Sequence, residues 1–252
     1  MEHILEYKGW VVAVAFALLF TYELLKPAVK SGAHPARRIL KNLSFWPINI
    51  GLSLLVILPV TFYATQHALW NRPDEWSGMW ALALDILILD LFLYGWHRGL
   101  HKIPFLWRFH QVHHLDEHLD TSSAIRFHFG EIFFATLIRA IVVVLIAVPF
   151  STVVIFETLV LVFTLFHHSN ITLPARFEKA LSKTIITPSI HWVHHHAIRK
   201  DTDSNYGTIF SIWDPIFRSK SKTQRYKKMK IGVENYNDTG FLKLLIAPFV
   251  SK

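Results

Sequence analysis

Cysteine is absent from the 252 residues of this sequence. Its absence excludes disulfide bridges, zinc ribbons, iron–sulfur clusters and thiolate nucleophiles. A bound metal must therefore be held by nitrogen and oxygen ligands, which leaves zinc, copper, iron and nickel open. The sequence also lacks the H-E-x-x-H motif of zinc proteases, haem attachment motifs, and the fingerprints that bind flavin or nicotinamide cofactors.

Charged residues are scarce as well, at 17% of the chain, whereas hydrophobic residues make up 52%. This balance favours a membrane protein over a soluble domain. Four apolar stretches cover residues 10–25, 45–65, 78–95 and 132–166. A spanning helix needs about 20 residues, and Pro149 and Ser151 interrupt the last stretch. We therefore expect it to form two short helices joined by a turn at 148–152, and four to five membrane helices in total.

Lysine and arginine are distributed unevenly among the connections between these stretches. Residues 26–44 contain five, residues 96–130 four and the chain after residue 167 fourteen, against one each in 1–9 and 66–77. The positive-inside rule assigns the richer connections to the cytoplasm. The histidine-rich segments all fall on that side.

Histidine is abundant, with 16 residues, and ten of them are grouped. His97 and His101 form H-x3-H; His110, His113 and His114 form H-x2-H-H; His191, His194 and His195 repeat H-x2-H-H; His128 and His168 stand between the second and third boxes. Neutral imidazole is a common metal ligand near pH 7, and spacings of three and four place side chains on one helix face. Eight to ten imidazoles are too many for one metal ion and suit two.

Three polar residues near the boxes are candidates to support a bound metal. Asp90 lies on the same helical stripe as His97 and His101. Because an acid inside a span usually has a partner and metal-bound histidines donate their second N–H to carboxylates, we expect Asp90 to accept from a box histidine. Asn170 and Asn205 could supply an oxygen ligand directly or through water, although Asn205 also suits an ordinary turn.

Arg139 and Glu157 lie inside the two arms of the final hairpin. At a rise of about 1.5 Å per residue they are roughly 16 and 10 Å from its turn, a gap that an arginine side chain can close. We expect the two to pair or to line a polar cavity.

The motifs together resemble the fatty acid hydroxylase/sterol desaturase superfamily. The resemblance rests on Asp90 to His101, Pro104 to His114, Arg126-Phe-His128, Phe166 to Asn170, Thr187 to His195, Asn205-Tyr206-Gly207 and Trp213-Asp214. It covers residues 85–217, whereas the first 80 residues match only in being hydrophobic. Three departures, at Trp192, at the His128-Phe-Gly-Glu131 segment and after Phe217, remove no ligand and lie where a substrate tunnel could be shaped.

From the hydropathy and charge pattern we expect an all-α integral membrane protein with a cytoplasmic helical cap built from residues 97–130 and 169–240. The resemblance implies a non-haem di-iron centre. Such a centre uses O2 to hydroxylate or desaturate an unactivated C–H position of a fatty-acyl, sterol or related lipid. The implied ligands are His97, His101, His110, His113, His114, His128, His168, His191, His194 and His195. The implied location is a bacterial inner membrane or the endoplasmic reticulum, and the implied electron source is a separate ferredoxin or cytochrome b5 type donor.

We expect one domain, with membrane helices in 1–80, the histidine-box core in 81–217 and a basic segment in 218–252. Residues 218–230 contain seven bases and no acid, which favours an acidic protein partner or anionic headgroups over nucleic acid. Two alternatives remain open. A membrane hydrolase with one zinc needs about three histidines, and a metal transporter needs a path of polar residues through the membrane.

Overall fold

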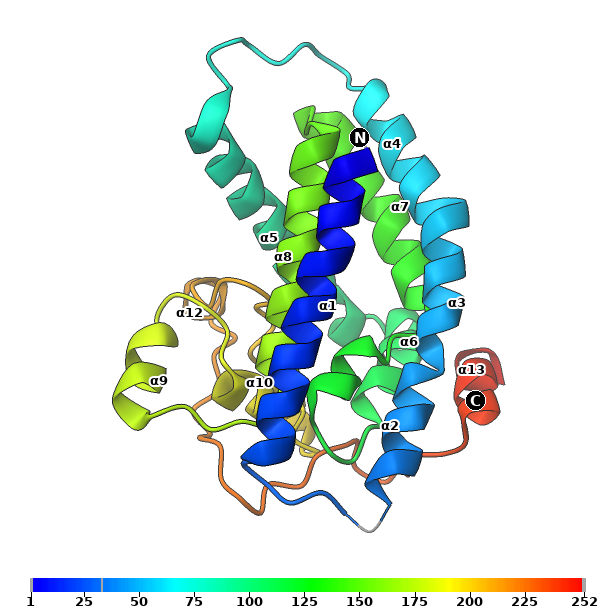
Figure 1. Cartoon of the computed structure of the whole chain (residues 1–252), viewed down its shortest axis with the longest axis vertical. Helices are drawn as coiled ribbons and strands as arrows, with labels where there is room; N and C mark the ends of the chain where they lie inside the picture. Colours follow the sequence, from blue (N-terminus) through cyan, green and yellow to red (C-terminus); the bar gives the residue numbers. More distant parts are fainter. Residues whose placement is uncertain (1, 33, 251–252) are drawn as a thin grey trace.

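The computed structural model describes residues 2–32 and 34–250, and every regular element in these ranges is a helix (Figure 1). Five helices are long and apolar enough to cross a membrane. They are α1 (Glu2–Leu25); the continuous helix formed by α2 (Pro35–Leu43), α3 (Phe45–Leu52), the π-helical η1 (Ser53–Ile57) and α4 (Leu58–Gln66); α5 (Gly78–Lys102); α7 (Phe129–Ile146); and α8 (Phe150–His168). The expected membrane helices are confirmed, including the final hairpin, although its turn lies at residues 147–149 and not at 148–152.

The first two spans begin earlier than expected, at Glu2 rather than residue 10 and at Pro35 rather than residue 45. Hydropathy marks the part of a helix that lipid covers, and not the point where the helix begins. Polar helix formers such as Glu6 and Lys8 extend α1 without raising its hydropathy. Pro35 lies in the first turn of α2, where its missing N–H leaves no hydrogen bond unmade.

A π turn interrupts the second span just before Pro59. The amide of Leu58 donates to the carbonyl of Ser53, five residues back. Pro59 has no amide to donate, so a wider turn at this point accommodates it. Such turns often occur at functional sites, and Ser53 and Ile57 line the cavity described below.

Helix α5 is longer than a bilayer requires. Its 25 residues extend about 37 Å, against a hydrocarbon thickness of about 30 Å. The last turns therefore carry His97 and His101 to one end of the bundle, where the shorter helices gather.

Those shorter helices form a cap at one end of the bundle (Figure 1). They are α6 (Pro104–His114), η2 (Thr121–Ile125), α9 (Ala175–Leu181), α10 (Pro188–His194), α11 (Arg199–Thr202) and α12 (Trp213–Ile216). The basic segment packs over this cap, since Met229 and Ile231 are buried together with Leu119 and Trp192. The final helix α13 (Phe241–Val250) packs on α6.

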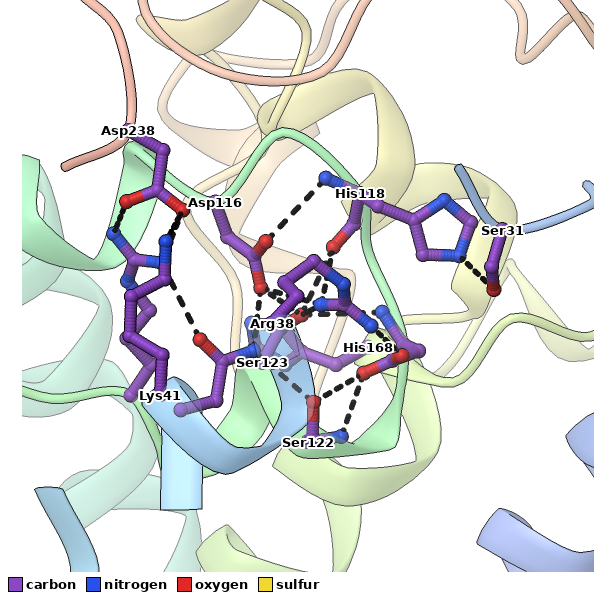
Figure 2. Close-up of polar contacts among 12 residues, drawn as sticks. Ser31, Arg38, Lys41, Asp116, His118, Ser122, Ser123, His168 and Asp238 are labelled. Carbon is purple, nitrogen blue, oxygen red and sulfur yellow. Dashed lines mark hydrogen bonds and ion pairs between the residues drawn. The ribbon is translucent and has the colours of Figure 1, made fainter. Parts of the chain in front are cut away.

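A buried polar network ties α2 to the cap (Figure 2). Asp116 accepts hydrogen bonds from Arg38, Asn42 and Ser123, at 2.7–2.8 Å. Burial opposes ionisation of Asp116, but the charges of Arg38 and Arg126 outweigh it and hold the pKa of this carboxyl below its usual value. The network therefore fixes the loop after the second histidine box against a membrane helix.

The loop of residues 67–77 closes the opposite end of the bundle. It donates hydrogen bonds to the carbonyls of residues 144–146, which end α7. Arg72 from this loop also donates two 2.8 Å hydrogen bonds to Asp85, whose side chain is 1% exposed. Asp85 therefore anchors the loop to α5.

Replacing Asp85 with asparagine leaves Arg72 without its counter-charge. Removing one partner of a buried ion pair costs about 3 kcal/mol of unfolding free energy. We expect Asp85→Asn to lower the thermal unfolding temperature in detergent, whereas Asp74→Asn, at an exposed acid of the same loop, leaves it unchanged. Equal effects of the two substitutions would contradict this role for Asp85.

Candidate metal centre

Nine of the ten histidines selected from the sequence lie together in two buried groups. In each group, one ring nitrogen from every histidine lies within 4.8 Å of the corresponding nitrogens of the others. One group contains His97, His101, His110, His114 and His194, and the other contains His113, His168, His191 and His195. The rings of His114 and His195 stack with centroids 4.2 Å apart and so join the two groups. Two adjacent sites, each rich in imidazole, result.

Four helices supply these side chains. The H-x3-H box lies on the last turns of α5, the first H-x2-H-H box ends α6, His168 ends α8, and the second H-x2-H-H box lies on and directly after α10. Thr187 occupies the N-cap position of α10 and Pro188 follows in its first turn, so the helix begins just before its histidines. Each box alone presents only two or three imidazoles, and the packing of the four helices brings nine together.

Most of the rings are held by their Nδ1 atoms. The N–H groups at Nδ1 of His97, His113, His168 and His194 donate to the backbone carbonyls of Tyr206, Arg126, Thr164 and Ser204, at 2.7–3.2 Å, and that of His110 donates to the carboxylate of Glu131 at 3.0 Å. A carbonyl can only accept, so Nδ1 carries the proton in these rings. The Nε2 atom of each neutral ring then presents a lone pair.

These lone pairs face each other across short distances. Nε2 of His97 lies 3.1 Å from Nε2 of His110 in the first group, and Nε2 of His113 lies 3.0 Å from Nε2 of His168 in the second. Two unprotonated nitrogens cannot hydrogen-bond to each other, and their lone pairs repel. A shared cation removes this repulsion, so the donor sets fit one metal ion in each group. All-imidazole donors suit iron, zinc and copper.

Burial keeps the histidines of the cap in the metal-binding form. His113, His114, His191, His194 and His195 lie outside the membrane-spanning helices and are at most 3% exposed. Desolvation, reinforced by the neighbouring imidazoles, lowers the pKa of each far below its usual value. The rings are therefore neutral near pH 7, which is the form that binds metal.

His128 is the one selected histidine that lies outside both groups. Its Nδ1 accepts from the amide of Gly130 at 3.0 Å, and its Nε2 donates to the carbonyl of Leu245 at 3.0 Å. Both nitrogens are therefore used in capping the start of α7 and in holding α13. The structure therefore places His128 at a helix N-cap, away from both groups, and not among the clustered histidines as expected.

Asp90 accepts from no histidine, contrary to expectation. It accepts hydrogen bonds from the amides of Ile209 and Phe210 and from the indole of Trp213. Asp214 holds the same loop by accepting from the amides of Tyr206 and Gly207. This loop presents the carbonyl of Tyr206, which orients His97. Asp90 therefore supports His97 indirectly, by holding the loop, and not by a direct hydrogen bond.

The two asparagines are also structural. The side chain of Asn170 exchanges two hydrogen bonds with the backbone of Val29 and so holds the chain that follows α1. Asn205 has a φ of 53°, donates to the carbonyl of Ile190 and accepts from the amide of Ser221. Both side chains thus hold backbone segments and not a histidine of either group, and Asn205 lies in a turn, as its alternative interpretation predicted.

Glu131 and the loop carbonyls are the residues at this site that the sequence did not assign. Glu131 is 6% exposed and pairs with His110. Its position three residues after His128, at the start of a helix, was the available signal. The sequence contains no signal for the carbonyls of Tyr206, Arg126 and Ser204, because every residue type has a backbone carbonyl.

A cavity of about 410 Å³ connects this centre to the interior of the membrane bundle. Six histidines line one end of it: His167 and five members of the two groups, which are His97, His110, His113, His168 and His191. The walls are mostly apolar and come from η1, α5, α7 and α8. An apolar ligand in this cavity has direct access to both histidine groups.

His168→Ala and His128→Ala separate ligands from structural histidines. We expect His168→Ala to lose metal from the second group, because it removes one of four closely spaced donors. His128→Ala removes only a cap and a contact to α13, so we expect it to retain the wild-type metal content with a lower unfolding temperature. The measurement is the metal-to-protein ratio of each purified variant, and metal loss in His128→Ala would contradict the assignment.

Comparison with known proteins identifies the family of this chain. The profile of the fatty acid hydroxylase family matches residues 82–219, more than half of the chain. Ornithine lipid hydroxylase OlsE of Rhizobium tropici is 28% identical over 180 residues, covering 71% of this chain and 54% of that protein. Human alkylglycerol monooxygenase is 26% identical over 213 residues, covering 80% and 45%, and rat cholesterol 25-hydroxylase is 22% identical over 192 residues, covering 74% and 63%.

The chain thus spans from under half to less than two thirds of the length of these relatives. No solved structure matches it significantly. The family profile covers all nine clustered histidines, which lie between residues 97 and 195. The chain therefore belongs to the fatty acid hydroxylase family, within the fatty acid hydroxylase/sterol desaturase superfamily.

Proposed function

We propose that this protein is an O2-dependent lipid hydroxylase with two iron ions, one in each histidine group. The observation that carries the proposal is the position of both groups at one end of an apolar cavity inside membrane-spanning helices. An all-histidine metal site at the end of a mostly apolar cavity suits oxidation of a lipid. The nine clustered histidines are the proposed ligands.

The residues of the chain supply positioning and exclusion of water. Phe92, Leu93 and Phe156 contribute to the apolar cavity wall, which would hold a hydrocarbon chain against the histidines. The same wall keeps water from the reactive centre. Two irons bound here supply the chemistry that activates O2 toward a C–H bond.

Hydroxylation is the reaction we favour over desaturation. The three relatives compared above are named as hydroxylases or a monooxygenase, and their named substrates are an ornithine lipid, alkylglycerols and cholesterol. In such a reaction one oxygen atom enters the C–H bond and the other leaves as water. Reduction of this second oxygen atom to water requires two electrons and two protons; a separate ferredoxin or cytochrome b5 type donor would provide the electrons, and the aqueous phase the protons.

The seven bases of residues 218–230, at the start of the basic segment, form the surface that we assign to this donor. Six of its seven bases are exposed, and the seventh, Arg225, stacks on Trp192 with its guanidinium carbon 3.9 Å from the ring centroid. Trp192 directly follows the metal-binding candidate His191. An acidic donor on this surface would thus lie over the third histidine box, on the side that the charge distribution assigns to the cytoplasm.

Metal analysis combined with an oxygen assay tests the proposed function. Protein purified without added metal is expected to contain about two irons per chain and, once reduced, to consume O2 only when a lipid substrate is present. A single zinc with O2-independent hydrolysis would support the hydrolase alternative. Metal transport without oxygen consumption would support the transporter alternative.

Charge reversal tests the docking surface. We expect Lys220→Glu, Lys222→Glu and Lys228→Glu together to slow reduction by the donor by at least tenfold at low salt, because electrostatic steering raises association rates by 10 to 10³. Metal content should stay at the wild-type value. The matched control replaces the same lysines with arginine, which keeps the charge, and an equal loss in that control would contradict electrostatic docking.

A further inference from the structure

The cavity that reaches the histidines has a second polar end, within the membrane-spanning helices. Lys8 of α1, Arg139 of α7 and Glu157 of α8 line it there. Nη2 of Arg139 lies 2.7 Å from Oε1 of Glu157, and Nζ of Lys8 pairs with Oε2 of the same carboxylate. The expected pairing of Arg139 with Glu157 and their place at a cavity are confirmed, and Lys8 joins them. We name these three residues the polar triad.

The polar triad lies far from the histidines along the bundle. On α8, Glu157 precedes His168 by eleven residues, which at about 1.5 Å per residue separates them by about 16 Å along the helix axis. The triad lies toward the end of the bundle where α1 begins and where α7 turns into α8, and the cap with the histidines lies at the other end (Figure 1). The cavity thus joins two polar sites through an apolar passage.

The charges of the polar triad do not cancel. Two cations share one carboxylate, which leaves one formal positive charge on side chains that are only 17–22% exposed. An unbalanced charge at membrane depth is costly, and ionisable residues there usually mark a substrate or ion pathway. Glu131, the other acid that lines the cavity, is paired with His110 at the opposite end. Among the side chains that the structure describes, no other carboxylate pairs with the triad, so the balance calls for an added anion.

We propose that the polar triad binds the anionic group of the lipid substrate, a carboxylate or a phosphate. The hydrocarbon chain of that lipid then runs through the apolar passage to the histidines. The reverse orientation would press a methyl end against three charged side chains and leave the positive charge unbalanced. Resting on the proposed function, this assignment places the oxidised carbon about 16 Å from the anionic group, deep in the chain rather than beside the headgroup.

Binding measurements test the polar triad without any turnover. Purified protein in a neutral maltoside detergent is titrated with hexadecanoate and with hexadecanol, and separately with phosphatidic acid and with diacylglycerol of the same chains. We expect the anionic member of at least one pair to bind about tenfold or more tightly, since a hydrogen bond to a charged group is worth that much. The pair that shows the preference identifies the source of the anion. Equal affinity within both pairs would overturn the proposal.

Three matched variants connect such a preference to the polar triad. Arg139→Gln and Lys8→Gln each remove one cation and are expected to reduce the anion preference by about tenfold, with the affinity for the neutral lipid unchanged. Glu157→Gln removes the competing carboxylate and is expected to keep or increase the preference. If Arg139→Gln does not fold, as judged by metal content and gel filtration, the other two variants decide. Wild-type preference in Lys8→Gln together with a loss in Glu157→Gln would mean that the triad only holds the helices together.

The position of the product gives a second readout. With anionic substrates of different chain length, we expect oxidation at a constant distance from the anionic group and not from the methyl end. Oxidation at a constant distance from the methyl end would overturn the proposed orientation. An absence of any oxidation, with the anion preference intact, would instead count against the proposed function and leave the binding site supported.

Discussion

The face-to-face packing of imidazole lone pairs is the constraint on which the rest of the structure depends. Nε2 atoms that lie 3.0–3.1 Å apart in a buried interior need a cation between them and a rigid scaffold around them. The scaffold begins at Nδ1, where backbone carbonyls such as that of Tyr206 fix four of the nine rings. It continues through Asp214 and Asp90, which hold the loop that carries this carbonyl. Asp90, an acid in the middle of a membrane helix, therefore supports the candidate metal centre without contacting its histidines.

The membrane environment explains why the buried acids accept several hydrogen bonds or form ion pairs. Glu23 accepts from the amides of Thr121 and Asn170, Asp85 binds Arg72, and Asp90 holds the loop around Trp213. In each case fixed protein donors replace the water that would otherwise solvate the carboxylate, because a desolvated charge without partners is costly. These three acids thus fasten loops to helices, whereas Glu131, the buried acid at the start of α7, pairs with His110. Glu157 differs, since its partners face the cavity and leave a positive charge there.

Periodicity and spacing predicted most of the architecture. The membrane helices, the hairpin of α7 and α8, and the approach of Arg139 to Glu157 follow from hydropathy and a fixed helical rise, which are local properties. Helix starts were missed where polar residues continue a helix beyond the bilayer, as at Glu2 and Pro35. The missing element of the triad, Lys8, is 131 residues from Arg139 in the chain, and only the packing of α1 against α8 brings it there.

By itself, the sequence determined which residue types could bind a metal, and nine of ten selected histidines do lie in the two groups. The sequence could not tell that His168 lies in a histidine group and His128 does not, because both are single histidines outside the three boxes. Tertiary structure decided between them: one occupies an N-cap with both nitrogens used, and the other ends a helix with Nε2 directed at His113. The same holds for Asp90, Asn170 and Asn205. A ligand is defined by where its lone pair points, and that direction is fixed only when distant segments pack together.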